Sequence, residues 1–304
     1  MKEINSEQKT LLIHHTIEVS DVKTHYVEQG KKQPLLMVDG WFGSWFAFSR
    51  VIPLLAEDFR CLAVDLPGFG ETSELKSPHI TENYAKFLSS FLEVIGLEKV
   101  IYLGASYGAL VGIKFASLYP ERVGKLILQG VPDFSSLPRV VRRLLGVLPD
   151  NLSTKVFEIG KNRGVLIEKV VSFNPQLRTW GKGHGKRVAE RARKASARAG
   201  IETINELLDF DLTEAKKIKT PTLLVDGADV SLSFMKTSSR LHKLMPKSRL
   251  VLIKEASHTL PGQKPKEFAE AIKSFIILRE ENNVASCGIN ITHPTERDKL
   301  LRDE

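Results

Sequence analysis

Residues 99–119 read KVIYLGASYGALVGIKFASLY, and this stretch decides the fold. It begins with an apolar, β-branched run typical of a buried strand and continues with apolar residues at helical intervals. Between the two lies Ser106, with a glycine two positions before it and another two positions after it. Small residues at those positions let the strand end and the helix start approach closely, so the hydroxyl projects from the carboxyl edge of a sheet. The stretch therefore predicts a strand, a tight turn and a helix, with Ser106 as a candidate nucleophile.

The rest of the chain extends this alternation of strands and helices. Short aliphatic runs alternate with amphipathic stretches up to about residue 134, and strand signals return near residue 220. This pattern is typical of an α/β fold whose mainly parallel, twisted sheet carries helices on both faces. We expect a core formed by residues 1–133 and 220–283, interrupted by a helical insert at 134–219. Residues 284–304 are polar and non-periodic, which predicts a C-terminal tail.

Composition narrows the class of protein. The chain has 304 residues, of which 42% are hydrophobic, as in folded soluble proteins. No stretch approaches the ~18 uninterrupted apolar residues of a membrane span, and the N-terminus lacks the apolar segment of a secretory signal. With only two cysteines, we expect a cytoplasmic protein without disulfides. No spacing indicates a metal or an organic cofactor.

Three further segments accompany the serine motif: LLMVDGWFGSWFAF from Leu35, VDLPGFGETS from Val64 and VLIKEASHTLPGQKPKEF from Val251. Together they resemble the α/β-hydrolase family over roughly residues 14–280, with the elements in the family's order. The resemblance implies an α/β-hydrolase fold in which the insert forms a cap over the pocket. It also implies that the backbone N–H groups of Trp41 and Tyr107 form an oxyanion hole. Asp39 stands where the family commonly has histidine.

The general base is the next element of the predicted site. A serine hydroxyl is a weak nucleophile, so it needs a base within hydrogen-bond reach. His258 lies in a loop that matches the family's spacing through Pro265 and Phe268. It is the only histidine of this chain in that setting, and we expect it to accept the proton of Ser106.

The base in turn needs an orienting carboxylate. The family's usual pattern is glycine, two residues and then aspartate, whereas Asp229 follows Gly227 by only two positions. Asp229 is nevertheless our first candidate, because a loop can absorb a one-residue deletion. Asp133 lies near the alternative position for the acid, which some family members use after the sixth strand. Asp226 is a further candidate if the strand that precedes Gly227 ends earlier.

These residues indicate the chemistry. Serine rather than aspartate at the nucleophile position argues against the family's dehalogenase and epoxide-hydrolase reactions, which need a carboxylate. We expect cleavage of a carboxylic ester or thioester through an acyl-enzyme, with a C–C bond hydrolase of the same triad as an alternative. A hydrolase-fold protein that binds or signals without turnover is the second class. Apolar residues expected near the pocket mouth are Phe42, Trp45, Phe134, Leu137, Val140 and Trp180.

A basic run in the insert carries much of the net charge of +8. From Arg178 to Arg198 it places basic side chains along a helical pattern with Glu190 as its sole acid. Such a run is usually a solvated helix face, and its functional alternative is a landing site for an anionic partner. An acyl carrier protein is one candidate, because pimeloyl-acyl-carrier-protein methyl esterases belong to the family; anionic lipid is another. No recognised module indicates a nucleic acid.

Overall fold

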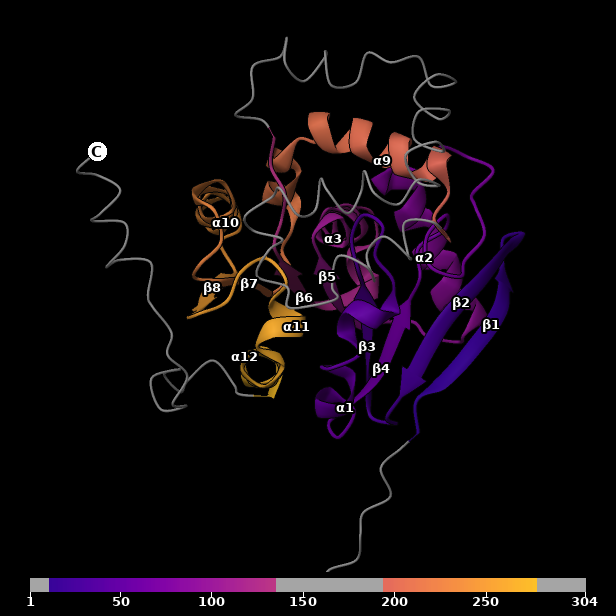
Figure 1. Ribbon diagram of the computed structural model, residues 1–304, viewed down its shortest axis with the longest axis horizontal. Coiled ribbons are helices and arrows are strands. Elements are labelled where there is room, and N and C mark those ends of the chain that lie inside the picture. Colours follow the sequence, from indigo (N-terminus) through magenta and orange to yellow (C-terminus); the bar gives the residue numbers. More distant parts are fainter. Residues whose placement is uncertain (1–10, 135–193, 278–304) are drawn as a thin grey trace, which may run out of the picture.

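The computed structural model describes residues 11–134 and 194–277. Within these ranges the strands form a single sheet in the order β1-β2-β4-β3-β5-β6-β7-β8 (Figure 1). Strands β1 and β2 run antiparallel to their neighbours, and the other neighbouring strands are parallel. The mainly parallel sheet predicted from the sequence is thus confirmed. The strands span Ile13–Val19 (β1), Val22–Gln29 (β2), Gln33–Val38 (β3), Phe59–Val64 (β4), Val100–Ala105 (β5), Val123–Gln129 (β6), Thr222–Gly227 (β7) and Ser248–Ile253 (β8).

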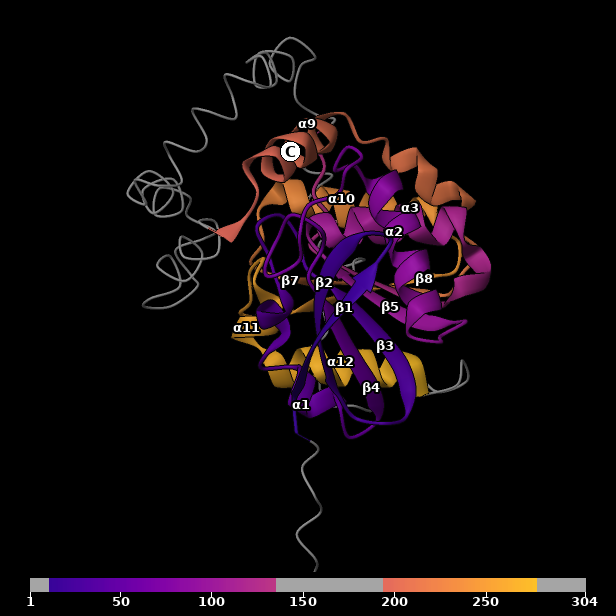
Figure 2. The same ribbon diagram turned by 90° about the vertical axis from the view of Figure 1, so that its right-hand side faces the viewer.

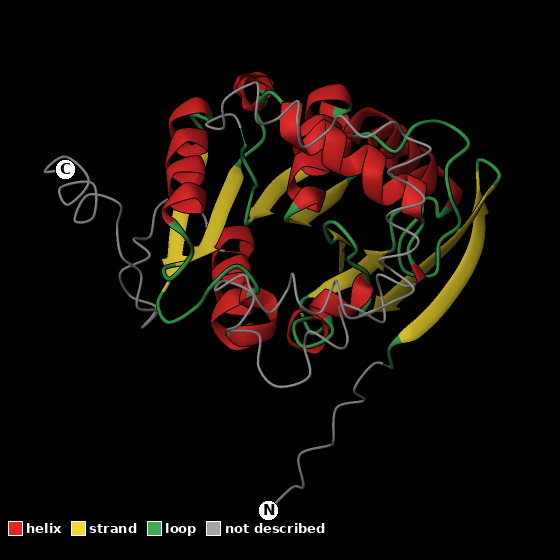
Figure 3. Ribbon diagram, turned by 45° about the horizontal axis from the view of Figure 1, so that its top comes forward, coloured by secondary structure: helices red, strands yellow, loops and turns green. Residues whose placement is uncertain are grey.

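Helices cover both faces of the sheet, as Figure 3 shows. Helices α2, α3 and α10 contribute to the core on one face, and α1, α11 and α12 contribute to the core on the other. Short 3-10 turns occupy Trp45–Phe48 (η1), Pro120–Arg122 (η2) and Leu212–Lys217 (η3). The α-helices span Ile52–Leu55 (α1), Thr81–Val94 (α2), Tyr107–Leu118 (α3), Ala197–Asp209 (α9), Leu232–Leu244 (α10), Leu260–Gln263 (α11) and Pro265–Ile277 (α12).

The central strands divide their side chains between two apolar cores. In β3, Leu36 and Val38 enter the core beside α2 and α3, whereas Leu35 and Met37 enter the core beside α1 and α12. Alternation of this kind follows from the two-residue period of a strand. Because both faces are buried, the strands read as continuous apolar runs, which is why the sequence marks them clearly.

The described end of the insert packs directly on the core. Helix α9 lies at the top of the molecule (Figures 1 and 2), and its Glu206 bonds the first residues of α2 and α3. The Ser196 amide just before α9 donates to the carbonyl of Gly68 at 2.8 Å. Gly68 has a φ of +84°, and a Cβ on it would collide with the side chain of Ala199. Glycine at this point of the VDLPGFG loop therefore lets α9 approach. The division into core, cap and tail stays a prediction, because most of the insert and the tail lie outside the described residues.

Among the helices in the described ranges, none is long and apolar enough to cross a lipid bilayer. The same ranges contain no cluster of histidine, cysteine, aspartate or glutamate arranged to hold a metal ion.

Candidate active site

Ser106 occupies the turn between β5 and α3 that the sequence predicts. Its φ of 54° and ψ of −122° put a non-glycine residue in a rarely populated backbone region. The turn is held by its amide, which donates to the carbonyl of Gln129 at 2.8 Å. Because α3 starts at the next residue, the positive end of the helix dipole faces the serine. The backbone thus presents a partly exposed hydroxyl at the carboxyl edge of the sheet.

The loop after β3 lies against this turn. A Cβ placed on Gly40 would lie 2.6 Å from the Cβ of Ser106 and 2.8 Å from the amide nitrogen of Tyr107. Only glycine fits at such separations, so the backbone of the loop can approach the start of α3. The close approach brings together the two segments whose amides, those of Trp41 and Tyr107, are predicted to hold an oxyanion.

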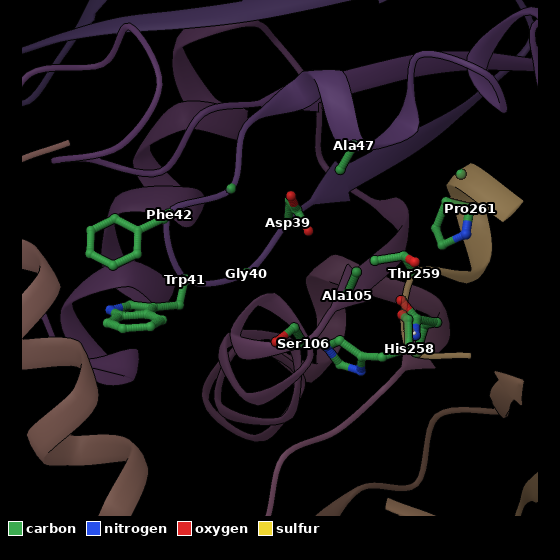
Figure 4. Close-up of a pocket in the computed structure, with 13 residues that line it drawn as sticks. Asp39, Gly40, Trp41, Phe42, Ala47, Ala105, Ser106, His258, Thr259 and Pro261 are labelled. Carbon is green, nitrogen blue, oxygen red and sulfur yellow. Dashed lines mark hydrogen bonds between the residues drawn. The ribbon is translucent and has the colours of Figure 1, made fainter. Parts of the chain in front are cut away.

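His258 lies beside Ser106 in the same pocket (Figure 4). Its ring packs against Gly130, which has a φ of +61° and where a Cβ would lie 2.7 Å from both Nδ1 and Cε1. The ring of Phe234 lies on it with a centroid distance of 4.6 Å. Burial lowers the pKa of His258 to about 4, because it disfavours the charged imidazolium. The imidazole is therefore neutral at neutral pH and able to accept a proton.

Gln129 and Gly130, which the sequence did not single out, connect the nucleophile with the base. The carbonyl of Gln129 accepts from the amide of Ser106, and its side-chain amide donates to the carbonyl of His258 at 2.8 Å. The next residue, Gly130, supports the imidazole ring. Their place at the carboxyl end of β6, beside the end of β5, was the only sequence signal that could have indicated this role.

The structure does not join Asp229 to the base. Its side chain is exposed, although its amide donates to the carbonyl of Ala256 at 2.9 Å, which ties it to the loop of His258. The Nδ1 atom of His258 is buried and has no hydrogen-bond partner in the described parts of the chain. Asp133 forms an ion pair with Arg240 at 3.0 Å.

Asp226, the remaining candidate acid, is buried at the end of β7. One of its carboxylate oxygens accepts from the amide of Gly130 at 2.6 Å, and the other accepts from the hydroxyl of Ser238 in a short hydrogen bond. Burial outweighs these two bonds and raises the pKa of Asp226 to about 7. The carboxyl group thus lies behind the glycine that supports His258, and both of its oxygens are occupied.

The pocket around Ser106 and His258 is partly polar and includes several small residues (Figure 4). Of the predicted pocket residues, Phe42 lines it, whereas Trp45 and Phe134 are not among its described lining. Trp45 instead meets the ring of His14 edge-on at 5.0 Å. Leu137, Val140 and Trp180 lie outside the described residues. The lining comprises Asp39, Gly40, Trp41, Phe42, Gly43, Ala47, Ala105, Ser106, Gln129, His258, Thr259, Pro261 and Gly262.

Two members of the basic run lie in the described part of the chain, and both are paired with acids. Lys194 lies 3.5 Å from Glu71, and Arg198 lies 3.0 Å from Glu202. The other basic residues of the run lie outside the described ranges. Nothing in the described residues supports an anionic partner at this segment.

Comparisons with known proteins agree with this fold. The family model for the alpha/beta hydrolase fold matches residues 33–265. The chain is 24% identical over 293 residues to 2-hydroxy-6-oxo-6-(2'-aminophenyl)hexa-2,4-dienoic acid hydrolase of Metapseudomonas resinovorans, covering 92% of this chain and 96% of that protein. It is 25% identical over 260 residues to pimeloyl-[acyl-carrier protein] methyl ester esterase of Vibrio campbellii, covering 83% and 97%.

The fold is also found in solved structures. The ligand-free epoxide hydrolase CorEH superposes with a TM-score of 0.74 at 20% identity, covering 87% of this chain and 98% of that one. A likeness at this identity shows the fold alone, while the family model covers most of the chain, including the serine turn and the histidine loop. The chain is therefore a hydrolase and belongs to the alpha/beta hydrolase fold family.

Proposed function

We propose that the chain hydrolyses a carboxylic ester or thioester of a small molecule, with Ser106 as nucleophile and His258 as general base. The observation that carries this proposal is the placement of Ser106 in a strained turn at a helix start, beside a neutral histidine in one pocket. A neutral imidazole accepts the hydroxyl proton, and the helix start favours negative charge developing next to it.

The proposed reaction proceeds in two halves. The oxygen of Ser106 attacks the substrate carbonyl carbon while its proton passes to His258, and the amides of Trp41 and Tyr107 bind the resulting oxyanion. The imidazolium then gives the proton to the leaving alcohol or thiol as its bond to carbon breaks. Water, deprotonated by His258, attacks the acyl-enzyme, and the carboxylic acid leaves as Ser106 recovers its proton.

Asp229 remains the proposed acid, because its backbone is tied to the loop that carries His258. A carboxylate at Nδ1 would stabilise the imidazolium formed in each half-reaction. In serine proteases, replacing this acid by its amide lowers kcat by about 10⁴. Asp229→Asn should therefore reduce turnover if the exposed side chain turns inward when substrate binds, and Asp133→Asn provides the comparison at the alternative position.

Cleavage of a C–C bond beside a ketone is the second candidate reaction. The relative from Metapseudomonas resinovorans, which matches nearly full length, is named as a dienoic acid hydrolase. In that case the leaving group is carbon, so the proton from His258 goes to carbon rather than to oxygen or sulfur. The same Ser106 and His258 would serve, and only the substrate would differ.

A fluorophosphonate probe and a series of p-nitrophenyl esters test the proposal whatever the natural substrate is. We expect the probe to label the wild type at Ser106 and the esters to release p-nitrophenol. Ser106→Ala should abolish labelling, and both Ser106→Ala and His258→Ala should lower kcat by about 10⁴ or more, because the two act as a unit. Ser117→Ala, in the last turn of α3, is the matched control.

Two results would contradict the serine hydrolase. Labelling that persists in Ser106→Ala would place the reactive group elsewhere. A wild type inert to the probe, to esters of every chain length and to dienoic acid ketones would favour the non-catalytic binding protein. The observation that favours a non-catalytic binding protein is the buried Nδ1 of His258, which has no partner within the described ranges.

A further inference from the structure

Helix α9 contacts both segments that are proposed to supply the oxyanion hole. From one segment, the indole Nε1 of Trp41 donates to the carbonyl of Gly200 at 2.9 Å. From the other, the phenol of Tyr107 donates to the carboxylate of Glu206 at 2.5 Å. Gly200 and Glu206 both belong to α9. The side chains of Trp41 and Tyr107 are therefore both bonded to one helix.

The bond between Tyr107 and Glu206 joins a buried phenol to a half-buried carboxylate. The Tyr107 side chain is 1% exposed and meets the ring of Tyr84 edge-on at 6.0 Å. Burial and the nearby Glu206 charge raise the pKa of the Tyr107 phenol well above its usual range, so the phenol stays protonated and donates. Glu206 also accepts from the amide and hydroxyl of Thr81 at 2.7 and 2.6 Å. A charged acceptor makes these hydrogen bonds stronger than bonds between neutral groups.

Tyr107 is the first residue of α3 and directly follows the strained Ser106. Rotation of its backbone would move the amide away from Gly40, against which it is packed. Anchoring the far end of the tyrosine ring restricts that rotation. On the other side, the bond from Trp41 to Gly200 restricts the loop after β3 in the same way.

We propose that Glu206 and the carbonyl of Gly200 are positioning groups that fix the oxyanion hole, through the side chains of Tyr107 and Trp41. Helix α9 belongs to the insert that is predicted to cover the pocket. The described helix of the insert is thereby linked to the groups proposed to stabilise the transition state. This inference rests on the proposed function of Ser106.

The same helix supplies a matched control. Glu202 lies one turn before Glu206 and accepts from the amide and ring Nδ1 of His79, at 2.7 and 2.8 Å, and from Arg198 at 3.0 Å. It thus anchors α9 by a similar number of bonds but touches neither Trp41 nor Tyr107. Glu202→Ala loosens the helix without releasing the oxyanion segments.

The experiment compares Tyr107→Phe, Trp41→Phe and Glu206→Ala with Glu202→Ala. We expect the first three to lower kcat on a p-nitrophenyl ester, and the rate of fluorophosphonate labelling, by about 10-fold, because misplacement of a catalytic group is costly. Their KM should change little, because the oxyanion forms only in the transition state. Glu202→Ala should retain the wild-type kcat. Tyr107→Phe removes one oxygen atom and keeps the ring, which protects against a simple failure to fold.

Hydrogen exchange of the peptide containing residues 39–43 gives a readout that does not depend on activity. The amide of Gly43 donates to the carbonyl of Gly40 at 2.8 Å, so its protection reports on the loop. We expect faster exchange in Trp41→Phe but not in Glu202→Ala. Equal loss of kcat in the Glu206 and Glu202 variants, or a wild-type kcat in Tyr107→Phe, would overturn the inference. A wild type that the probe does not label refutes the proposed hydrolase instead, and unchanged exchange in Trp41→Phe would then overturn the positioning role as well.

Discussion

The serine side and the histidine side of the pocket differ in how fully their polar groups are satisfied. On the serine side, the amide of Ser106 is bonded to Gln129 and the backbone of Gly40 packs against the turn. On the histidine side, Nδ1 of His258 is buried with no partner in the described ranges, and Asp229 is exposed. Backbone bonds and a glycine contact satisfy the serine side, whereas a partner for Nδ1 on the histidine side depends on where one carboxylate side chain lies.

The difference shows which parts of such a site tolerate change. A strained turn packed on glycine admits almost no variation, because any added atom collides with backbone. The position of an acid depends on loop length, and the loop after β7 is one residue shorter than the family pattern. Substitutions on the two sides should therefore differ in their effects.

Among the changes that test this contrast, the largest effect is expected from adding one methyl group on the serine side. Gly40→Ala would place Cβ 2.6 Å from the Cβ of Ser106 and 2.8 Å from the Tyr107 amide. We expect kcat to fall by about 10²–10³, as when an oxyanion donor is lost. Steady-state kinetics on the best p-nitrophenyl ester, together with thermal unfolding, measure the effect.

The control for this change is Gly124→Ala, where the nearest atoms would lie 3.7 Å from the new Cβ, an ordinary contact distance. It should retain the wild-type kcat. A fully active Gly40→Ala would show that catalysis does not need the close approach of the two segments. The serine side would then tolerate variation as the histidine side does.

The pH dependence of kcat/KM tests the histidine side. If Nδ1 has no carboxylate partner, neutral His258 persists down to its pKa of about 4. The rate should then stay level from about pH 8 to about pH 5 and fall only below that, because protonated imidazole cannot act as a base. A stopped assay with a neutral ester measures the profile.

A midpoint near the ordinary histidine pKa of about 6.5, or above it, would mean that a carboxylate stabilises the imidazolium in solution. If Asp229→Asn then moves the midpoint down, Asp229 is that carboxylate. If only Asp133→Asn does so, the acid follows β6 instead. With either result, Nδ1 of His258 would have a carboxylate partner, and the polar groups of the two sides would be equally satisfied.

The smallest effect is expected at Asp226, behind the histidine. Its pKa is raised to about 7 in the folded chain, above its ordinary value of 3.8, so the folded state holds the proton more tightly than the unfolded state. Below the pKa of the unfolded state, this carboxyl therefore does not lower the free energy of unfolding. As the pH rises from there to about 7, it lowers the free energy of unfolding progressively. Asp226→Asn should gain about 2–3 kcal/mol in unfolding free energy relative to wild type between about pH 5 and about pH 8.

Urea unfolding at the two pH values measures this difference. Glu98→Gln, at an exposed position, should show no such change. If Asp226→Asn and the wild type differ in unfolding free energy by the same amount at both pH values, the carboxyl is ionised in the folded chain. Its charge would then be available behind Gly130 to support an imidazolium.

The sequence predicts the serine side well because its signals are local. A β-branched run, a serine flanked by glycines and an apolar helix determine β5, the turn and α3 without reference to distant residues. The placement of His258 beside Ser106 follows from the same fold, since both lie at the carboxyl edge of the sheet. The mainly parallel sheet was predicted for the same reason, because its buried strands are continuous apolar runs.

The sequence could not place the groups that meet across the fold. Gln129 and Gly130 carry no motif, and their role arises because β6 lies between β5 and β7. Likewise, the contact of Glu206 with Tyr107 joins residues 99 positions apart. For Asp229, a one-residue difference in loop length left its direction open. The predicted pocket residues Trp45 and Phe134 are not among the described lining.

The amino-acid sequence by itself determined the order of strands and helices, the serine turn and the histidine loop, because periodicity and glycine spacing act over a few residues. The tertiary structure alone decided that Asp226 is buried behind Gly130 and that Nδ1 of His258 has no partner in the described ranges. It also decided that α9 bonds the side chains of both Trp41 and Tyr107. These contacts depend on which distant segments the sheet brings together, and burial then sets the charge state of each group they enclose.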